Sequence, residues 1–202
     1  MTLRKFDEAS LVKRIAGLPS LSMGLFSLCC ATRQVKAYEH FAERFVPEYM
    51  GTASTIVNRL WNAASNKSFE QINLDSALNE AMDLLPDEQD QWAPFHVYAD
   101  HAIASLAYAI RCLRDSNPQE AAWSARRALD SADQGAIRDL DIQTGTSEFE
   151  AMILAHPFVQ RELERQERDL DLLHSEPLAQ NIEALRGNAF SESILELNDL
   201  SK

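Results

Sequence analysis

The sequence predicts an all-α fold, a single-domain bundle of several helices built around one buried helix at residues 95–115. The composition favours helix, because the chain has only 6 glycines in 202 residues and few β-branched residues beside its Ala, Leu, Glu, Gln and Arg. Apolar residues also recur at spacings of three and four along most of the chain, the period of an amphipathic helix. No Pro- or Gly-rich linker divides the sequence, so we expect one domain over residues 1–202.

The stretch 95–115 is apolar around most of its circumference, as expected of a buried helix. Its aliphatic stripe recurs at spacings of three and four and consists of Ala99, Ile103, Leu106, Ile110 and Leu113. A neighbouring side holds small residues, namely Ala102, Ser105, Ala109 and Cys112. Because small side chains let a second helix approach closely, we expect this helix to have neighbours on two sides.

The residues before position 51 predict two or three helices. Asp7 is suited to cap the first, and Ser20 to cap the second. The second pattern either continues or bends into a further helical stripe at 35–45, which ends before Pro47.

Between residues 52 and 94 we expect two helices. The first begins at Thr52 or Ser54, and the second is capped by Asn73 and stopped by Pro86. The acidic stretch 87–90 then connects it to the central helix.

The dipeptide Asn117-Pro118 predicts the start of a helix that runs to about residue 143, with Asn117 as cap and Pro118 in the first turn. One face is a seam of mostly alanine, formed by Ala122, Ala125, Leu129, Ala132, Ala136 and Leu140. We expect this seam to pack against the small-residue side of the central helix, whose aliphatic stripe then faces the early helices.

The last third predicts a turn at 144–147, a short helix at 148–155 and a charged helix from Pro157. The inner face of the charged helix is expected to hold Val159, Leu163, Gln166, Leu170 and Leu173, and Glu164 is placed to pair with Arg168 one turn later. Pro177 interrupts the pattern, and Gly187-Asn188 is expected to end the following helix. The tail 190–202 either docks as a short helix or stays loose.

The charge balance excludes some partner classes. Lys and Arg number 19 against 31 Asp and Glu, a net charge of −12 that argues against nucleic acid or an anionic membrane as the principal partner. The acidic stretch 130–150 suits a basic partner or simply a solvated face. The run 15–31 lacks charge but is too often interrupted by Gly, Pro and Ser for a membrane span or a secretory signal. Cys29, Cys30 and Cys112 lack metal-ligand spacing and predict buried, reduced thiols in a cytoplasmic protein.

Four stretches together resemble a known bacterial family. They are FSLCCATR at 26–33, LDSALNEAMDLLPDE at 74–88, VYADHAIASLAYAI at 97–110 and HPFVQRELERQERDLDLL at 156–173. In this order and spacing the chain is similar to the uncharacterised proteobacterial family catalogued as domain of unknown function 416. The resemblance implies a compact, all-helical, cytosolic protein, and it supplies no activity, cofactor or catalytic residue.

The first candidate binding residues are His96, Asp100 and His101, at the start of the central helix. His96 and Asp100 lie four residues apart on one face, so they can share a metal, or the carboxylate can orient the imidazole for base catalysis. A metal site needs more ligands than this pair, and no HExxH motif supplies them. The alternative is that these side chains cap the helix, pair with neighbours or face solvent. We expect no metal and no cofactor.

A second candidate set is Glu39, His40 and Glu43. Di-iron helical bundles use paired Glu and Glu-x-x-His sets, but here the order is His-x-x-Glu and occurs once. The solvent-facing side of an amphipathic helix accounts for these residues, and we favour this interpretation. Trp123 is able to anchor a partner, but we expect it in the core.

Three functional hypotheses follow. The first is a non-catalytic protein-interaction or regulatory module, a helical bundle that forms a homodimer. The second is a metal-binding or hydrolytic enzyme that uses His96 and Asp100, which predicts that His40 shares one pocket with this pair. The third is an acidic binder that neutralises a basic protein partner.

Overall fold

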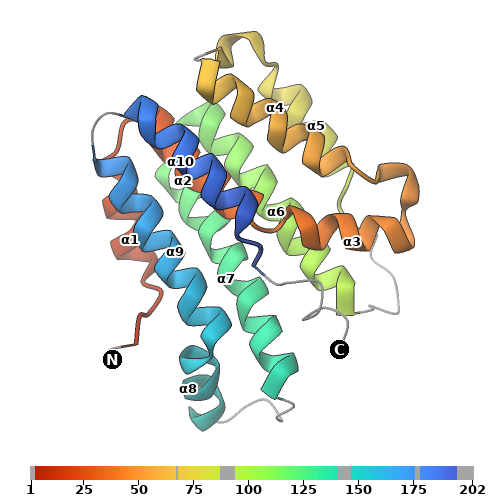
Figure 1. Cartoon of the computed structure of the whole chain (residues 1–202), viewed down its shortest axis with the longest axis vertical. Helices are drawn as coiled ribbons and strands as arrows, with labels where there is room; N and C mark the ends of the chain where they lie inside the picture. Colours follow the sequence, from red (N-terminus) through yellow and green to blue (C-terminus); the bar gives the residue numbers. More distant parts are fainter. Residues whose placement is uncertain (1–2, 67, 87–93, 141–146, 176–177, 195–202) are drawn as a thin grey trace.

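The computed structural model describes residues 3–66, 68–86, 94–140, 147–175 and 178–194. Within these ranges the chain forms ten α-helices, two short 3-10 helices and no strand, which confirms the all-α prediction (Figure 1). None of these helices combines the length and the apolarity that a membrane crossing requires. They are α1 (Glu8–Ala16), α2 (Ser20–Thr32), α3 (Val35–Phe45), η1 (Pro47–Tyr49), α4 (Thr52–Asn66), η2 (Phe69–Gln71), α5 (Leu74–Met82), α6 (Pro94–Asp115), α7 (Pro118–Leu140), α8 (Ser147–Ala155), α9 (Pro157–His174) and α10 (Leu178–Ser191).

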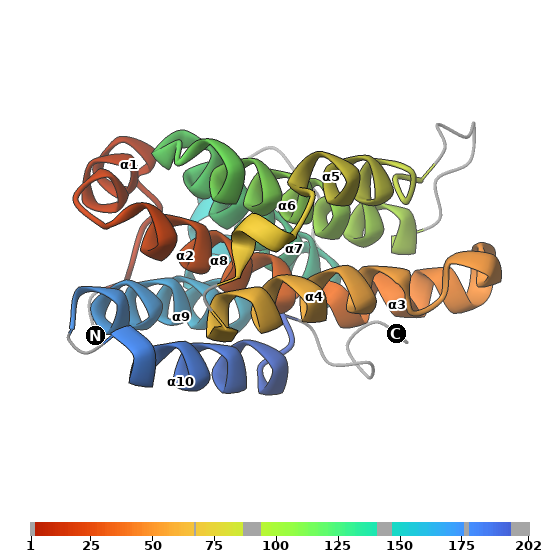
Figure 2. The ribbon, with the colours of Figure 1, turned by 90° about the horizontal axis from the view of Figure 1, so that it is seen from above.

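Helix α6 is the predicted central helix. Its aliphatic stripe is buried except at Leu113, which is partly buried, and Ile103 and Ile110 are fully inaccessible to solvent. It packs against α2, α3, α5 and α7. Figure 2 shows α9 and α10 side by side on the side of the molecule opposite α5. Helix α6 packs against α5, and α2 and α7 pack against both α6 and α9.

The small-residue side of α6 packs against the alanine seam of α7, as the sequence predicts. Ser105 and Ser124 make a hydroxyl–hydroxyl hydrogen bond of 2.8 Å across this contact, and the Ser124 hydroxyl also donates to the Ser27 carbonyl of α2 at 3.0 Å. On the other side of α6, a Cβ at Gly24 of α2 would lie 2.8 Å from Cγ of Leu113. Only glycine lets α2 and α6 approach this closely.

Three of the predicted caps are confirmed and one is wrong. The side chains of Asp7, Asn73 and Asn117 accept hydrogen bonds from the backbone N–H groups of Ser10, Ser76 and Gln119, at 3.1, 2.9 and 3.0 Å. Ser20 is instead the first residue of α2, and the cap position is Pro19, which makes no side-chain cap. The extended backbone of Pro19 (φ −58°, ψ 151°) sets the direction of the helix without a capping oxygen.

The end of α10 also differs from the prediction. The helix continues through Gly187 to Ser191. Ala189 is buried beyond the glycine, and the burial of its face offsets the cost of about 1 kcal/mol that one glycine imposes on a helix. The chain then stays docked as far as Ile194, which is buried and whose N–H donates to the Arg33 carbonyl at 3.0 Å. The rest of the predicted tail, the acidic stretch 87–90, most of the turn 144–147 and Pro177 lie outside the described residues.

Candidate functional site: an apolar face along α3

The break between α2 and α3 is held by a buried ion cluster around Arg33. Its guanidinium donates to both carboxylate oxygens of Glu162, at 3.1 and 2.9 Å, and to Asp169 at 2.6 Å. The three side chains are 0–1% exposed. Burial disfavours the charge of Arg33, but Glu162 and Asp169 outweigh this effect and raise the pKa of the guanidinium. The cluster therefore fixes the bend from which α3 leaves α2.

A second set of charges continues this cluster and fixes the end of α10. Arg168 donates to both oxygens of Glu192 at 2.7 Å and to Asp169 at 3.2 Å, so the predicted pair of Arg168 with Glu164 is replaced. Arg165 donates to the Ser193 carbonyl at 3.0 Å. Bidentate Arg–carboxylate pairs of this kind are geometrically specific, so α10 is held in one position against α9.

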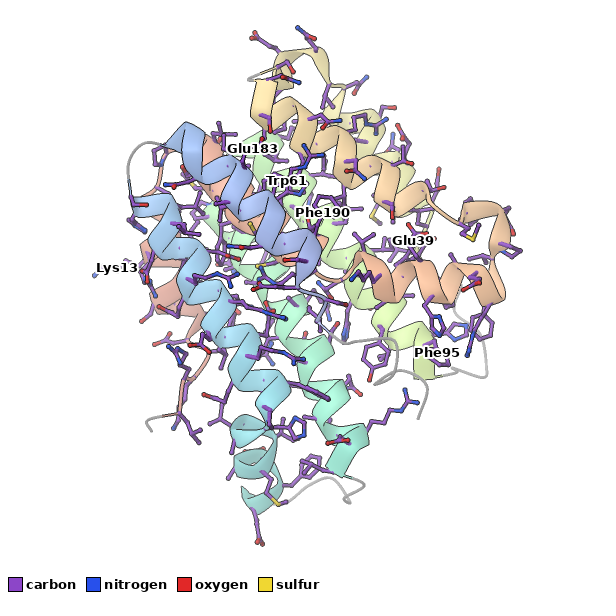
Figure 3. All side chains as sticks on the ribbon, in the orientation of Figure 1. Lys13, Glu39, Trp61, Phe95, Glu183 and Phe190 are labelled. Atoms are coloured by element: carbon purple, nitrogen blue, oxygen red, sulfur yellow. The ribbon has the colours of Figure 1, made fainter. Side chains whose placement is uncertain are left out.

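The bend of the chain and the held end of α10 form two walls of a groove of about 610 Å³. We call it the α3–α10 groove. Its volume lies within the range of about 300–1,000 Å³ that is typical of binding sites. Figure 3 labels Glu39 and Phe190, which line it from α3 and α10. Its other lining residues include Val35, Lys36, His40, Glu43, Met50, Asn58 and Ala189.

Large apolar side chains are exposed where α3 turns through η1 into α4. We call this group the apolar corner, defined as Phe45, Tyr49 and Met50, which are 44%, 38% and 61% exposed. Met50 also lines the α3–α10 groove. Three large apolar residues exposed within six positions is more than the scattered single exposures of an ordinary surface.

The other side of the apolar corner borders a second cavity, of about 370 Å³, which we call the aromatic pocket. Its residues are Phe41, Phe45, Val46, Tyr49, Asp83, Leu84, Leu85, Pro86 and His96. The rings of Phe41 and Phe45 stack with centroids 5.2 Å apart, and the His96 ring lies 5.0 and 5.1 Å from them. The α3 helix thus carries the groove on one side and the aromatic pocket on the other.

The structure places the two histidines of the first predicted site in different surroundings. His96 is buried in the aromatic pocket, whereas Asp100 is only partly buried. His101 is buried on a different side of α6, where its Nδ1 lies 3.4 Å from the Ser131 hydroxyl. That hydroxyl donates to Gln34 at 2.8 Å. Burial lowers the pKa of His101, so this imidazole belongs to a polar network inside the core.

His40 and His96 do not meet. His40 lines the α3–α10 groove and its ring packs against Phe95 with centroids 5.3 Å apart, while His96 lines the aromatic pocket. Among the residues that the structure describes, no group of three or more His, Cys, Asp or Glu side chains is placed to hold a metal ion.

Glu39 has a structural role that the sequence analysis missed. Its carboxylate accepts hydrogen bonds from the N–H groups of Gly51 and Ser54, at 2.6 and 2.9 Å, and from the Ser54 hydroxyl at 2.7 Å. These N–H groups belong to the start of α4, so Glu39 caps that helix from a neighbouring one. Glu43, one turn later, is exposed.

The cysteines are buried as predicted, whereas Trp123 is not. All three cysteines are free and buried. Burial raises the pKa of the Cys29 and Cys30 thiols, and raises that of Cys112 to about 11. The expectation that Trp123 lies in the core is wrong, because this side chain is 38% exposed and packs beside Tyr108 with ring centroids 5.5 Å apart.

The residues that shape this face carried only indirect signals in the sequence. On α9, Glu162, Gln166 and Asp169 are spaced at intervals of four and three, next to the apolar stripe, which places polar groups on the inner face. The exposed group Phe45, Tyr49 and Met50 surrounds Pro47, and apolar residues around a proline turn give no periodic pattern by which exposure is recognised.

Comparison with known proteins agrees with this fold. The family model described as "Protein of unknown function (DUF416)" matches residues 10–195. A crystal structure of a DUF416 family protein from Shewanella baltica OS155 superposes with a TM-score of 0.78 and is 19% identical in sequence. The superposition covers 94% of this chain and 97% of that one. No curated protein matches the chain. The chain belongs to the DUF416 family, as its sequence motifs indicate.

Proposed function

We propose that this chain is a non-catalytic protein-interaction module that binds a partner through the apolar corner and the two cavities beside it. The observation that carries the proposal is the exposure of Phe45, Tyr49 and Met50 between the α3–α10 groove and the aromatic pocket. Aromatic and Met side chains are enriched in the cores of protein interfaces, where the residues that dominate binding fill well-packed pockets. The proposal places the module in the cytoplasm, where buried thiols stay reduced.

Two charged groups beside this face have structural roles, which leaves them unsuited to catalysis. Glu39 caps α4, and Arg33 pairs with Glu162 and Asp169. A partner that docks beside these two residues would therefore contact mainly the apolar side chains of the face. An enzyme that uses His96 and Asp100 receives less support, because His96 and His40 line different cavities.

Site-specific photo-crosslinking in the native host tests the proposal. A photoreactive amino acid replaces Met50 in one variant and Met152 in the control, since Met152 is 39% exposed on α8, away from the face. We expect one saturable crosslinked species at position 50, which disappears when Phe45 and Tyr49 are both changed to Ser. Equal crosslinking at positions 50 and 152, or insensitivity to the Ser substitutions, would show that the face is not an interface.

A further inference from the structure

The apolar corner is bordered by exposed carboxylates. Glu43 lies in the last turns of α3, Glu48 within η1 and Asp83 directly after α5, and all three are exposed. Glu43 also lines the α3–α10 groove and Asp83 the aromatic pocket. We call these three residues the acidic rim.

The basic residues on the same face do not neutralise the acidic rim. In the described part of the chain, no ion pair within 4.0 Å joins a rim carboxylate to Lys or Arg. Arg44, which neighbours Glu43 in the sequence, has its guanidinium over the Phe95 ring at 4.9 Å. Lys36 is two turns away along α3, where it lines the groove.

Carboxylates also lie near the buried hydroxyl of Tyr38, inside the molecule. Burial is the main cause that raises its pKa, and the nearby carboxylates of Glu39 and Glu48 raise it further. The Tyr38 oxygen is buried and makes no hydrogen bond in the described structure. Carboxylates thus border this corner at the surface, and two carboxylates also act on the Tyr38 hydroxyl beneath it.

From this arrangement we infer that the partner is a basic amphipathic segment, whose apolar side chains enter the aromatic pocket and whose Lys or Arg side chains meet the acidic rim. The inference rests on the proposed function and adds the chemistry of the partner to it. A second copy of this chain fits the same face poorly, because a twofold contact through this face would bring two copies of the acidic rim into one interface. Complementary charge gives specificity and faster association, whereas like charges oppose docking.

The test uses the full-length chain and two synthetic fluorescent peptides of about four helical turns. Both peptides carry Leu and Phe on one face; the first has only Lys on its polar face, and the second has Glu at the same positions. Fluorescence anisotropy measures binding at low salt and again at about 300 mM salt, where charge interactions are strongly screened. We expect the Lys peptide to bind at least about tenfold more tightly than the Glu peptide at low salt, and to lose much of this advantage at high salt.

Since the whole chain is acidic, a matched control separates the acidic rim from the net charge. The rim variant is Glu43→Gln/Glu48→Gln/Asp83→Asn. The control variant is Glu148→Gln/Glu150→Gln/Glu164→Gln, which removes the same charge from exposed positions on α8 and α9. We expect the rim variant to bind the Lys peptide about tenfold more weakly and the control variant to change the affinity by less than about threefold.

Three other outcomes of the peptide experiment would contradict the inference. Equal loss in both variants overturns the inference, because it shows attraction to net charge alone. Equal binding of the Lys and Glu peptides, or failure of both to bind, also overturns it. The crosslinking experiment is independent of these peptides: a partner captured at position 50 that lacks a basic amphipathic segment refutes the inference and leaves the proposed function intact.

Discussion

Arg33 lies in the molecule where an arginine is rarely found, because charged side chains are almost never fully buried unless they are paired. Its partners are 129 and 136 positions further along the chain. Removing one member of such a cluster leaves the other charges without compensation in a poorly hydrated environment. The intact cluster therefore adds little net stability, whereas loss of one of its members lowers the free energy of unfolding strongly.

The first prediction concerns this cluster. Arg33→Met is expected to lower the free energy of unfolding by about 3–5 kcal/mol, because Glu162 loses its ion-pair partner while buried and Asp169 keeps only the longer contact with Arg168. The neutralised triple variant Arg33→Met/Glu162→Gln/Asp169→Asn is expected to recover most of this loss. Urea unfolding followed by circular dichroism measures both values. A single variant that costs less than about 1 kcal/mol would contradict the account of the cluster.

The second prediction is a pH dependence at Asp133. Burial and the neighbouring charge of Asp130 raise the pKa of Asp133 to about 6, above its ordinary value of 3.8. The folded state thus binds this proton more tightly than the unfolded state does. This carboxyl therefore lowers stability above about pH 6, and the penalty disappears as the pH falls toward 3.8.

We expect Asp133→Asn to stabilise the protein by about 1 kcal/mol at about pH 7.5, allowing for solvent screening, and to have almost no effect at about pH 4. Urea unfolding at the two pH values measures the difference. Asp171→Asn, at a carboxylate whose side chain is 78% exposed, is the control and should show no such dependence. A gain of equal size at both pH values would mean that the charge of Asp133 is not its cause.

Helix α4 depends on a carboxylate from another helix for its start. Glu39 of α3 accepts from Gly51 and Ser54, so the angle between α3 and α4 and the start of α4 are set by the same side chain. Local capping rules look for a capping residue immediately before the helix. They therefore offer Thr52 or Ser54 as the beginning of α4, which the structure places at Thr52, and they miss the residue that stabilises it.

The third prediction tests this contact. Glu39→Ala is expected to destabilise the fold by about 1–2 kcal/mol, because two backbone N–H groups at the start of α4 lose their acceptor. Hydrogen exchange should become faster in the first turn of α4 and stay unchanged in α9. Glu43→Ala, one turn along the same helix and exposed, serves as the control with a change within about 0.5 kcal/mol. Similar values for the two variants would refute the capping role.

Much of the fold was predictable from the sequence, because the buried face of a helix recurs as apolar residues at spacings of three and four. The aliphatic stripe of α6 and the alanine seam of α7 are buried as expected except at their last members, Leu113 and Leu140, which are partly buried. Ser105 of α6 meets Ser124 of α7 across this contact. The candidate face was not predictable in the same way. It joins α3, η1 and the residues after α5, and its cavities arise from contacts between helices that no local pattern encodes.

The fourth prediction concerns assembly of the whole molecule. Trp123, Tyr108 and Arg111 form a partly exposed cluster on α6 and α7, in which Arg111 lies 4.8 Å from the Tyr108 ring and pairs with Glu120 at 2.8 Å. Its charges are balanced, and Trp, Tyr and Arg are the residues that most often anchor interfaces. We therefore propose that the homodimer forms here, on a surface separate from the apolar corner.

Light scattering at micromolar concentration measures this directly. We expect the mass of a dimer for the native chain and of a monomer for Trp123→Gln, while Met152→Gln, changed at another exposed apolar residue, remains a dimer. A native chain that gives only the monomer mass would rule out the dimer. A dimer that survives Trp123→Gln would place the interface elsewhere.

The distance along the chain between Arg33 and its carboxylate partners has a consequence during synthesis. A ribosome adds about 5–20 residues per second, so Glu162 is made roughly 6 to 26 s after Arg33. Throughout that interval α2 and the start of α3 exist without the two carboxylates that pair with the guanidinium. The surroundings of Arg33 can therefore take their buried, ion-paired form only after α9 has been synthesised.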